Sequence, residues 1–345
     1  MSTVADALPQ AQAATVQIAG GASFSCAPGD TLLRAGLRAG LGLPYECNAG
    51  GCGSCKFELV FGSVDELWPE APGIRAKERE RGRRLACQSV PRSDCEVKIR
   101  TADTYVPHSI PQRLSARFVG SRAVTADIRE FDFLAPGPAN FLPGQYALLR
   151  LPTAGQDRAY SMSNQPNAQG LWRFMVRLVP GGKVSADLFA LAEGAKVGLD
   201  GPYGMGHLRR AAQRDIVCIA GGSGLAPMVS IINGALEQPA LDGREAWLFY
   251  GGRGPADIPQ IDGFIHPQPR VRFHPAISVP ALAEGTDWAG EVGMVHEMLP
   301  RKLPHLLSSY EYYLAGPPPM IEAVVRMLQA DHHVSAEAIH YDRFF

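Results

Sequence analysis

The sequence predicts a multidomain chain in which an N-terminal cysteine-rich domain is followed by an antiparallel β-barrel and an α/β domain with a parallel sheet. Three observations predict this order. Six of the seven cysteines lie within residues 14–100, together with a glycine-rich loop. Short alternating apolar runs separated by Pro and Gly then follow, as is typical of antiparallel strands. Beyond them, apolar strand-like runs alternate with helical stretches. The predicted domains span residues 14–101, 111–210 and 211–345.

Composition and charge exclude two classes of partner. The formal net charge is −1, so a nucleic-acid partner is not expected. Residues 216–236 carry no charged side chain and have membrane-spanning length, but their Gly, Pro, Ser and Asn fit a strand, a loop and a helix start instead. Residues 1–15 lack the positive start and apolar block of a signal peptide. We therefore expect a cytoplasmic protein without a membrane partner. In that compartment, cysteines are expected to serve metal or redox chemistry rather than to form disulfides.

Four cysteines have the spacing of a plant-type [2Fe–2S] site. Cys47, Cys52 and Cys55 follow the pattern C-x4-C-x2-C, and 31 residues separate Cys55 from Cys87. Two irons need four converging thiolates and nearby backbone N–H groups, and the loop residues between the cysteines, Asn48 apart, are small enough to allow that approach. Four cysteines can also bind zinc, but zinc sites usually pair two C-x2-C units. The cluster is therefore the favoured prediction.

The remaining cysteines and a basic segment are expected to have structural roles. Cys26, Cys95 and Cys218 have no partners in a ligand spacing and are expected to be small buried apolar residues. The segment 75–84 carries six Lys or Arg residues and two Glu residues. A solvated helix face is the favoured interpretation, and docking of an acidic partner or of another domain is the alternative.

A second motif, Arg158-Ala159-Tyr160-Ser161, places a cation, an aromatic ring and a hydroxyl on one strand and turn. Arg158 and Tyr160 share a face of that strand. An arginine fork can hold a pyrophosphate while the ring and the hydroxyl contact a flavin. Residues 180–185 open a candidate helix whose first N–H groups suit the same pyrophosphate. An ordinary strand end and helix cap can have the same residues as these two motifs. The evidence for a flavin site is therefore their order along the chain, after the cysteine domain.

A third motif joins a strand to a helix through glycines. Residues 216–220 form an apolar run that leads into Gly222-Ser223-Gly224-Leu225-Ala226-Pro227, and a helix is predicted to start near Pro227. Small residues let backbone donors approach a phosphate, and Pro suits a first helical turn. The pattern ends in Pro, so the dinucleotide fingerprint is incomplete. After the next strand, Arg253 favours a 2′-phosphate and Asp257 a free 2′-hydroxyl, and the sequence leaves that choice open.

Taken together, these motifs resemble the ferredoxin–NADP reductase superfamily in its fused oxygenase-reductase form, and most closely the reductase components of toluene- and phenol-type multicomponent diiron monooxygenases. The resemblance spans nearly the whole chain and is carried by residues 44–55, 67–73, 85–88, 158–161, 200–204, 221–228 and 339–345. It implies a plant-type [2Fe–2S] ferredoxin domain of the β-grasp class (α+β), an FAD-binding antiparallel β-barrel and an NAD-binding α/β domain.

The resemblance also implies roles for particular residues. Ser161 would be the catalytic residue near the reactive nitrogen of the flavin, and Ala315 stands where many relatives have a Cys beside the nicotinamide. Phe344 or Phe345 would contact the flavin ring, with a hydrophobic C-terminal anchor as the alternative. The implied cofactor-binding residues are Arg158, Tyr160, Ser161, Gly182, Lys183, Val184 and Ser185 for FAD, and Gly222, Gly224 and Pro227 for the NADH pyrophosphate. The implied metal ligands are Cys47, Cys52, Cys55 and Cys87.

The resulting hypothesis is an NAD(P)H-dependent flavin and iron–sulfur oxidoreductase. Electrons would pass from NADH through FAD and the [2Fe–2S] cluster to the oxygenase component, or to an intermediary ferredoxin, of an aromatic or hydrocarbon monooxygenase system. The reductase of a Rieske-type aromatic ring dioxygenase is the alternative within this class. A redox sensor that binds partners according to cluster state is the alternative from another class, and it has little use for a flavin site and a glycine turn.

Overall fold

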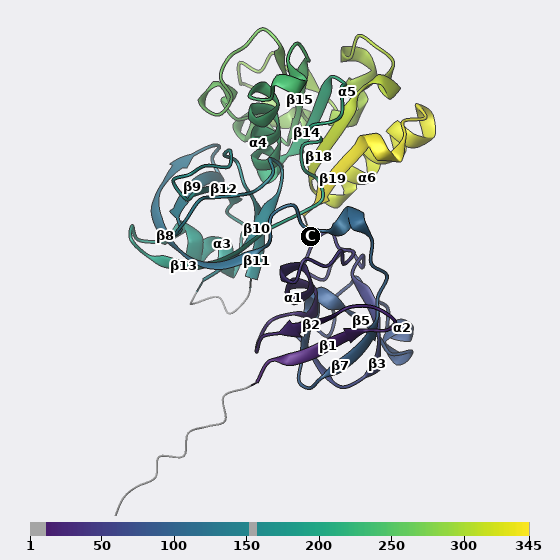
Figure 1. Cartoon of the computed structure of the whole chain (residues 1–345). Helices are drawn as coiled ribbons and strands as arrows, with labels where there is room; N and C mark the ends of the chain where they lie inside the picture. Colours follow the sequence, from purple (N-terminus) through teal and green to yellow (C-terminus); the bar gives the residue numbers. More distant parts are fainter. Residues whose placement is uncertain (1–11, 152–156, 345) are drawn as a thin grey trace, which may run out of the picture. The chain divides into compact units, whose positions relative to one another are not determined.

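The computed structural model describes residues 12–151 and 157–344. The chain divides into two compact units, Met1–Pro111 and Gln112–Phe345, which are described separately (Figure 1). The N-terminal unit carries the cysteine loop, and the C-terminal unit contains both the barrel and the α/β domain. The boundary between the units lies next to residue 111, where the barrel is predicted to start.

A five-stranded mixed sheet forms the N-terminal unit. Its order is β2 (Ser23–Cys26), β1 (Ala14–Ile18), β7 (Cys95–Lys98), β3 (Lys56–Phe61) and β5 (Arg83–Leu85). The pair β1–β7 is parallel, and the other pairs are antiparallel. Helix α1 (Leu32–Arg38) begins where the Thr31 hydroxyl accepts a hydrogen bond from the Arg34 N–H, and its leucines are completely buried. This arrangement confirms the predicted α+β fold of the β-grasp class.

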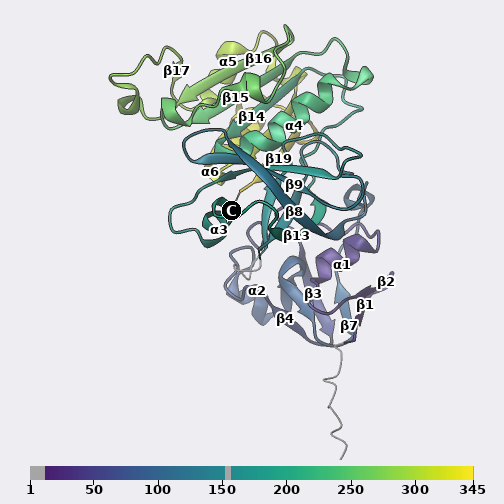
Figure 2. The ribbon, with the colours of Figure 1, turned by 90° about the vertical axis from the view of Figure 1, so that its left-hand side faces the viewer.

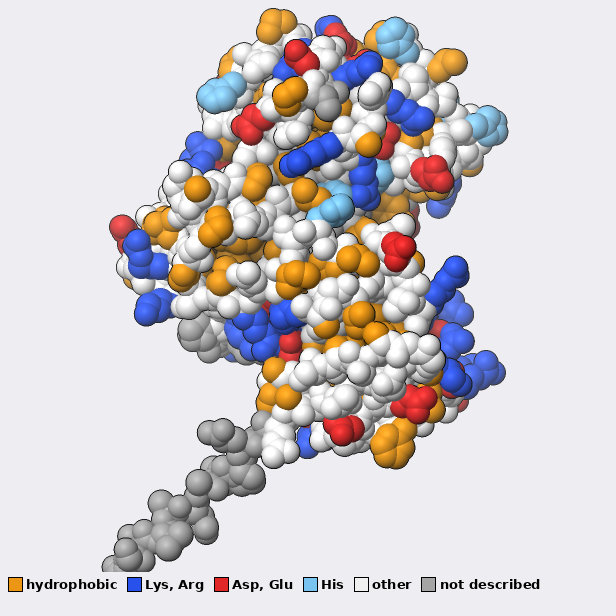
Figure 3. Space-filling model, viewed as in Figure 1, with side chains coloured by type: hydrophobic (Ala, Val, Ile, Leu, Met, Phe, Trp, Pro, Cys, Tyr) orange, Lys and Arg blue, Asp and Glu red, His pale blue; other side chains and the backbone are white. Residues whose placement is uncertain are grey.

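The basic segment 75–84 is only partly helical. Helix α2 (Ala76–Glu80) covers its first half, whereas Arg84 lies in strand β5. The prediction of one solvated helix face is therefore wrong for the second half, because pairing with β3 extends the sheet there. Glu66 neutralises part of the charge by forming ion pairs with Arg79 and Arg84. Figure 3 shows Lys and Arg side chains gathered over this edge of the N-terminal unit.

Six antiparallel strands form the predicted barrel. Their order is β11 (Asp157–Ser161), β10 (Tyr146–Arg150), β13 (Lys196–Tyr203), β8 (Gln112–Ala123), β9 (Ile128–Leu134) and β12 (Leu171–Arg177). An antiparallel bridge between Met162 and Phe174 brings the two ends of this order together. Aromatic rings, among them Phe133, fill the interior, and helix α3 (Lys183–Phe189) packs against it through Val184. The closed antiparallel arrangement confirms the prediction.

The α/β domain is a six-stranded parallel sheet with helices on both faces. Its order is β17 (Glu291–Val292), β16 (Val271–Ile277), β15 (Ala246–Gly252), β14 (Ile216–Gly221), β18 (Glu311–Gly316) and β19 (Ile339–Arg343). Helix α4 (Leu225–Leu236) covers one face, and helices α5 (Val295–Lys302) and α6 (Pro318–Arg326) cover the other. Figures 1 and 2 show α4 on the side of the sheet next to the barrel. The parallel sheet confirms the predicted class.

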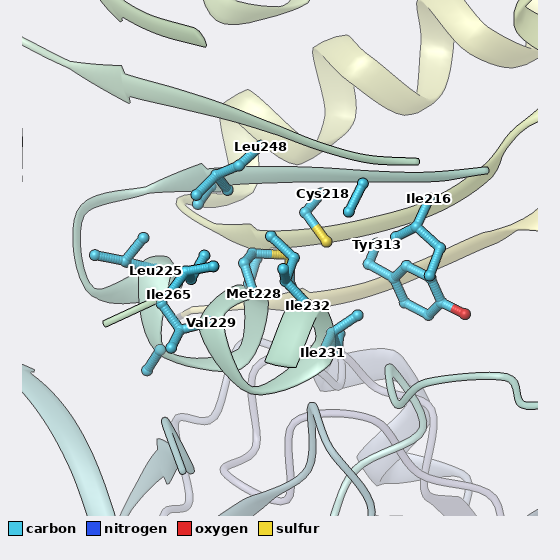
Figure 4. Packing of buried hydrophobic residues seen from close by; sticks show 14 of the residues in the cluster. Ile216, Cys218, Leu225, Met228, Val229, Ile231, Ile232, Leu248, Ile265 and Tyr313 are labelled. Atoms are coloured by element: carbon cyan, nitrogen blue, oxygen red, sulfur yellow. The ribbon is translucent and has the colours of Figure 1, made fainter. Parts of the chain in front are cut away.

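The uncharged stretch 216–236 folds into a strand, a turn and a helix, as predicted. Strand β14 passes through a short 3-10 turn into α4, which starts at Leu225, two residues before Pro227. Cys218 on β14 is completely buried in the apolar cluster between the sheet and α4, which also contains Ile232 of that helix (Figure 4). Cys26 and Cys95 are buried as well, so the expected apolar role fits all three cysteines. Among the described residues, no helix combines the length and the apolar character that a membrane crossing needs.

One buried serine joins α4 to the barrel. The Ser230 hydroxyl donates a hydrogen bond to the carbonyl of Asn164 at 2.8 Å, and the side chain of Gln165 donates to the Ser230 carbonyl at 2.7 Å. Ser230 has no exposed surface, so both bonds are shielded from water. Because Asn164 and Gln165 follow β11 closely, the strand predicted to hold the flavin is fixed to the helix that follows the glycine turn.

Gly224 should be sensitive to the smallest substitution. A Cβ atom at this position would overlap the carbonyl oxygen of Ala315 on β18. Overpacking costs roughly 1–3 kcal/mol, and each kcal/mol lowers the melting temperature of a unit of this size by about 2–4 °C. We therefore expect Gly224→Ala to melt several degrees below the wild type in scanning calorimetry. Gly263→Ala is the matched control, since its Cβ meets nothing within 4 Å, and equal melting of the two variants would contradict the close approach.

Candidate functional site

The four predicted metal-ligating cysteines lie in two pairs. The Sγ atoms of Cys47 and Cys52 are 3.3 Å apart, and so are those of Cys55 and Cys87. Cys52 is partly exposed, and the other three are buried. The pKa of the Cys47 thiol is raised, first by its hydrogen bond to Cys52, then by burial, with a smaller contribution from the charge of Cys87. The second pair brings Cys87 to the cysteine loop, as a site shared by the four thiols requires.

Backbone N–H groups point at the sulfurs of the loop. Those of Ala49 and Cys52 donate to Cys47 Sγ at 3.5 and 3.4 Å, and that of Ser54 donates to Cys52 Sγ at 3.5 Å. The pKa of Cys52 falls to about 5, chiefly because the Cys47 thiol donates to it, with help from Ser54. Donors of this kind stabilise negative charge on sulfur, which metal-bound thiolates carry.

Asn48 adds a buried donor to the loop. The residue is 2% exposed and adopts a φ of 50°, in the left-handed region. Its Oδ1 accepts a hydrogen bond from Arg34 Nε at 3.4 Å, whereas its Nδ2 has no hydrogen-bond partner among the described residues. Leaving a buried amide donor without an acceptor is unfavourable, and the sulfides of a [2Fe–2S] cluster are acceptors. The loop therefore fits the cluster that its spacing predicts.

Residues 67–73 lie directly against the cysteine loop. The Gly73 N–H donates to the Gly50 carbonyl at 2.9 Å. A Cβ atom on Gly53, whose φ is +78°, would overlap the carbonyl oxygen of Gly73, and one on Gly50 would lie 3.3 Å from the ring of Trp68. The loop residues must be small because this segment leaves no space. Trp68 itself is 43% exposed, so an aromatic ring lies between the loop and solvent.

Strand β11 carries the residues predicted to bind the flavin. Arg158 is exposed, Tyr160 is half-buried against the barrel core, and Ser161 is 4% exposed. Burial raises the pKa of Tyr160 to about 12, although the Arg158 charge acts in the opposite direction. The phenol therefore stays protonated and can donate a hydrogen bond. The Ser161 hydroxyl has no hydrogen-bond partner in the described part of the chain and is available to a ligand.

The predicted second flavin segment precedes helix α3. Gly182 is the N-cap of this helix, and Gly181 before it has a φ of +73°. The Ser185 hydroxyl accepts a hydrogen bond from the Val179 N–H at 3.1 Å and donates to the Gly182 carbonyl at 3.3 Å. Ser185 thus shapes the loop itself, a role that the sequence does not indicate. Val184 packs against the same barrel core as Tyr160, and Lys183 is exposed.

A cavity of about 260 Å³ opens at the carboxyl ends of the parallel strands, beside the glycine turn. Open α/β sheets bind ligands at this edge. Of the three residues predicted to border the pyrophosphate, Gly222 lines the cavity, Gly224 packs against Ala315, and Pro227 is buried in the first turn of α4. Side chains not anticipated from the sequence also line it, namely Asp127, Arg177, Tyr250, Ser278, Met294 and Met320. The rule that ligands bind beyond strand ends would have pointed to Ser278, which follows β16.

Arg253 and Asp257 both line the cavity. The Asp257 carboxylate accepts hydrogen bonds from the backbone N–H groups of Arg253 at 2.8 Å and Gly254 at 3.2 Å. Asp257 therefore holds the turn after β15 and places its carboxylate at the position predicted for the adenosine ribose.

Phe344 packs against the apolar cluster between α4 and the sheet, and its N–H donates to the Gly316 carbonyl at 3.0 Å. These contacts match the hydrophobic-anchor alternative, and contact with a flavin ring stays a prediction. Phe345, its predicted equivalent, lies outside the described residues. Ala315 is completely buried on β18.

Three family models match the chain in succession. A 2Fe-2S iron-sulfur cluster binding domain matches residues 16–92, an oxidoreductase FAD-binding domain matches residues 115–207, and an oxidoreductase NAD-binding domain matches residues 218–326. The cofactors predicted from the motifs, a [2Fe–2S] cluster, FAD and the nicotinamide dinucleotide, are thereby confirmed.

Proteins of known function are similar over nearly the whole chain. The ferredoxin–NAD(P)+ reductase CarAd of Metapseudomonas resinovorans is 41% identical, over 96% of this chain and 99% of that protein. The ferredoxin–NAD+ reductase component of the alkene monooxygenase system of Xanthobacter autotrophicus is 38% identical, over 94% and 98%. The solved structure of the ferredoxin reductase in carbazole 1,9a-dioxygenase matches with a TM-score of 0.89 and 37% identity, over 97% of this chain and 99% of that one.

Gly53→Ala should disrupt the cysteine loop without affecting the C-terminal unit. A non-glycine residue with positive φ costs roughly 1–2 kcal/mol, and the overlap with Gly73 adds to that. Iron and acid-labile sulfide should fall strongly, while FAD content stays at the wild-type level. Gly21→Ala in the β1–β2 turn is the control, because its Cβ has no neighbour closer than 3.7 Å. A Gly53→Ala protein with a full cluster would show that the loop is not confined as described.

Proposed function

The chain belongs to the family of ferredoxin–NAD(P)+ reductase components of oxygenase systems, and from that premise we propose that it delivers electrons from NADH to the oxygenase component of an aromatic or hydrocarbon monooxygenase system. As such a reductase it is an NAD(P)H-dependent flavin and iron–sulfur oxidoreductase. When bound, FAD and the [2Fe–2S] cluster convert a two-electron donor into one-electron deliveries. The proposal rests on four paired cysteine sulfurs in a chain that also has a cavity at a glycine turn. A redox sensor would leave that cavity unexplained.

Each domain contributes through its own residues. The four cysteines are the cluster ligands in this proposal, and the backbone N–H groups around them stabilise its charge. On the barrel, Arg158 holds the pyrophosphate of FAD together with residues 182–185, and the Tyr160 phenol donates to the cofactor. The buried Ser161 hydroxyl would lie near the reactive nitrogen of the flavin. At the glycine turn, the Gly222 backbone faces the NADH phosphates.

NADH is the proposed donor because, of the two charged residues after β15, Asp257 is fixed in place whereas Arg253 is exposed. Asp257 is fixed by two backbone N–H groups and lines the cavity. A fixed carboxylate can accept a hydrogen bond from a free ribose hydroxyl and repels a phosphate at the same position. We therefore expect a lower kcat/KM with NADPH than with NADH.

The type of oxygenase partner is the finer part of the proposal. A monooxygenase is supported by the alkene monooxygenase relative and by relatives that serve xylene/toluene and phenol monooxygenases. A specific observation favours the dioxygenase alternative, since the structural match to the carbazole 1,9a-dioxygenase reductase covers almost all of both chains. In either system the immediate acceptor is an oxygenase component or a ferredoxin.

Cys87→Ala should separate the two halves of the electron path. One cluster ligand is lost, so NADH-dependent reduction of cytochrome c should fall by more than the roughly 10–100-fold typical of losing a supporting hydrogen bond at a metal site. Reduction of ferricyanide, which accepts electrons directly from a flavin, should persist because the C-terminal unit is unchanged. Stopped-flow absorbance with each acceptor measures both rates.

Cys95→Ala is the matched control for this variant, because Cys95 is buried in the same unit but is not one of the four paired cysteines. It should keep both activities. Metal analysis of anaerobically purified wild-type protein completes the test. Zinc in place of iron and sulfide, or cytochrome c reduction that survives Cys87→Ala, would contradict the proposed path.

Acceptor proteins can decide the partner type. The NADH-reduced protein should reduce the diiron hydroxylase component of an aromatic monooxygenase, alone or with that system's ferredoxin, faster than it reduces the Rieske ferredoxin of a ring dioxygenase. Rapid-mixing spectroscopy at equal acceptor concentrations gives the two rate constants. The reverse order would assign the chain to the dioxygenase class and leave its role as a reductase intact.

A further inference from the structure

Positive charge is concentrated in residues 67–84 of the N-terminal unit (Figure 3). This segment carries six Lys or Arg residues and three Glu residues, a formal net charge of +3, whereas the rest of the chain has a formal net charge of −4. Glu66 neutralises two of the cations by pairing with Arg79 and Arg84. Three others are exposed and form no ion pair with a described residue, namely Arg75, Lys77 and Arg81.

Helix α2, within this segment, lies beside the cysteine loop. Lys56, the residue after Cys55, donates a hydrogen bond through Nζ to Glu78 of α2 at 3.0 Å. The Lys56 side chain also lies 3.2 Å from a Cβ atom built on Gly53 in the loop. The unpaired cations are therefore carried by a segment that borders the predicted cluster ligands.

Two exposed apolar side chains begin the same segment. Leu67 is 58% exposed, and Trp68 is largely exposed as well. The Leu67 N–H donates to the carbonyl of Gln88, the residue after Cys87, at 2.8 Å, and the Trp68 ring lies against Gly50 of the loop. The apolar pair thus borders both stretches of chain that carry the paired cysteines. Protein interfaces favour an aromatic residue at the centre and charged residues around it.

We propose that these five residues, Leu67, Trp68, Arg75, Lys77 and Arg81, form a docking surface for a one-electron acceptor protein with an acidic face. The inference rests on the proposed function. A cluster held by four thiolates carries net negative charge and by itself repels an acidic protein. Unpaired cations beside the loop offset that repulsion and steer the acceptor toward it. In each delivery the reduced cluster loses one electron and the acceptor gains it, with NADH as the source.

The test uses the full-length protein loaded with FAD and cluster, and two haem proteins of opposite charge as acceptors, acidic cytochrome b5 and basic cytochrome c. Lys77→Glu/Arg81→Glu reverses two of the unpaired cations. At low ionic strength its kcat/KM for cytochrome b5 should be roughly tenfold below that of the wild type, the lower end of electrostatic steering effects, and its kcat/KM for cytochrome c should be higher. Both differences should shrink as salt is added, because salt screens exposed charges.

Trp68→Ala tests the apolar part of the surface. Its kcat/KM for cytochrome b5 should be lower at every salt concentration, because salt does not screen an apolar contact. Iron content and the visible absorption spectrum show whether each variant keeps its cluster.

Arg117→Glu/Lys196→Glu is the matched control. It makes the same change in net charge at two exposed residues that lie opposite each other on β8 and β13 of the barrel. It should change the kcat/KM for either cytochrome less than Lys77→Glu/Arg81→Glu does.

Equal kcat/KM values for cytochrome b5 in the two charge-reversed variants would overturn the inference. Slower reduction of the cluster by NADH in Lys77→Glu/Arg81→Glu, measured by stopped-flow absorbance without an acceptor, would also overturn it, because the surface would then serve the chain's own C-terminal unit. An unchanged kcat/KM in Trp68→Ala would remove the apolar contact from the docking surface. Failure of the wild type to reduce either cytochrome with NADH would instead contradict the proposed function.

Discussion

The cysteine loop and the nucleotide turn share one constraint. In each, a glycine backbone lies so close to a neighbouring carbonyl that a Cβ atom would not fit. In the cysteine loop Gly53 faces the Gly73 carbonyl, and at the nucleotide turn Gly224 faces the carbonyl of Ala315. In the first case the lack of side chains lets backbone N–H groups reach sulfur, and in the second it leaves the Gly222 backbone open to the cavity. Main-chain donors are held in place by the surrounding sheet and need no side-chain ordering, so these sites are organised before a cofactor binds.

Within the C-terminal unit, the flavin strand and the nucleotide turn are parts of one packed structure. Ser230 bonds to the segment that follows β11, and Asp127 fixes Arg177 over the turn that follows β14. Hydride transfer requires reacting atoms roughly 3–3.5 Å apart, a tolerance that a flexible linker between domains does not meet. Buried hydrogen bonds and apolar packing between the barrel and α4 satisfy this requirement instead.

The sequence predicted those features whose residues are close together in the chain. The spacing of the cysteines, the order strand–glycine turn–helix and the position of α3 all follow from local patterns, and the structure agrees with them. The Arg177–Asp127 pair joins residues 50 positions apart, and no local pattern indicates which of many surface arginines will reach a cavity. The prediction of one helix face over the basic segment 75–84 was wrong for a similar reason. Strand β5 pairs with a strand that is distant in the sequence and so ends the expected helix early. The hydrogen bonds of Ser185 within its own loop likewise appear only in three dimensions.

The distribution of thiols has a consequence for oxidative damage. Cys218 is the one cysteine of the sequence after residue 111, and it is completely buried. Cys52 is the partly exposed cysteine, and the other six are buried. Peroxide and alkylating reagents act on accessible thiolates, so Cys52 would be their first target whenever the loop is without its cluster. A chain damaged in this way would lose one-electron delivery, while the C-terminal unit, whose single thiol is buried, would keep its own cofactor sites.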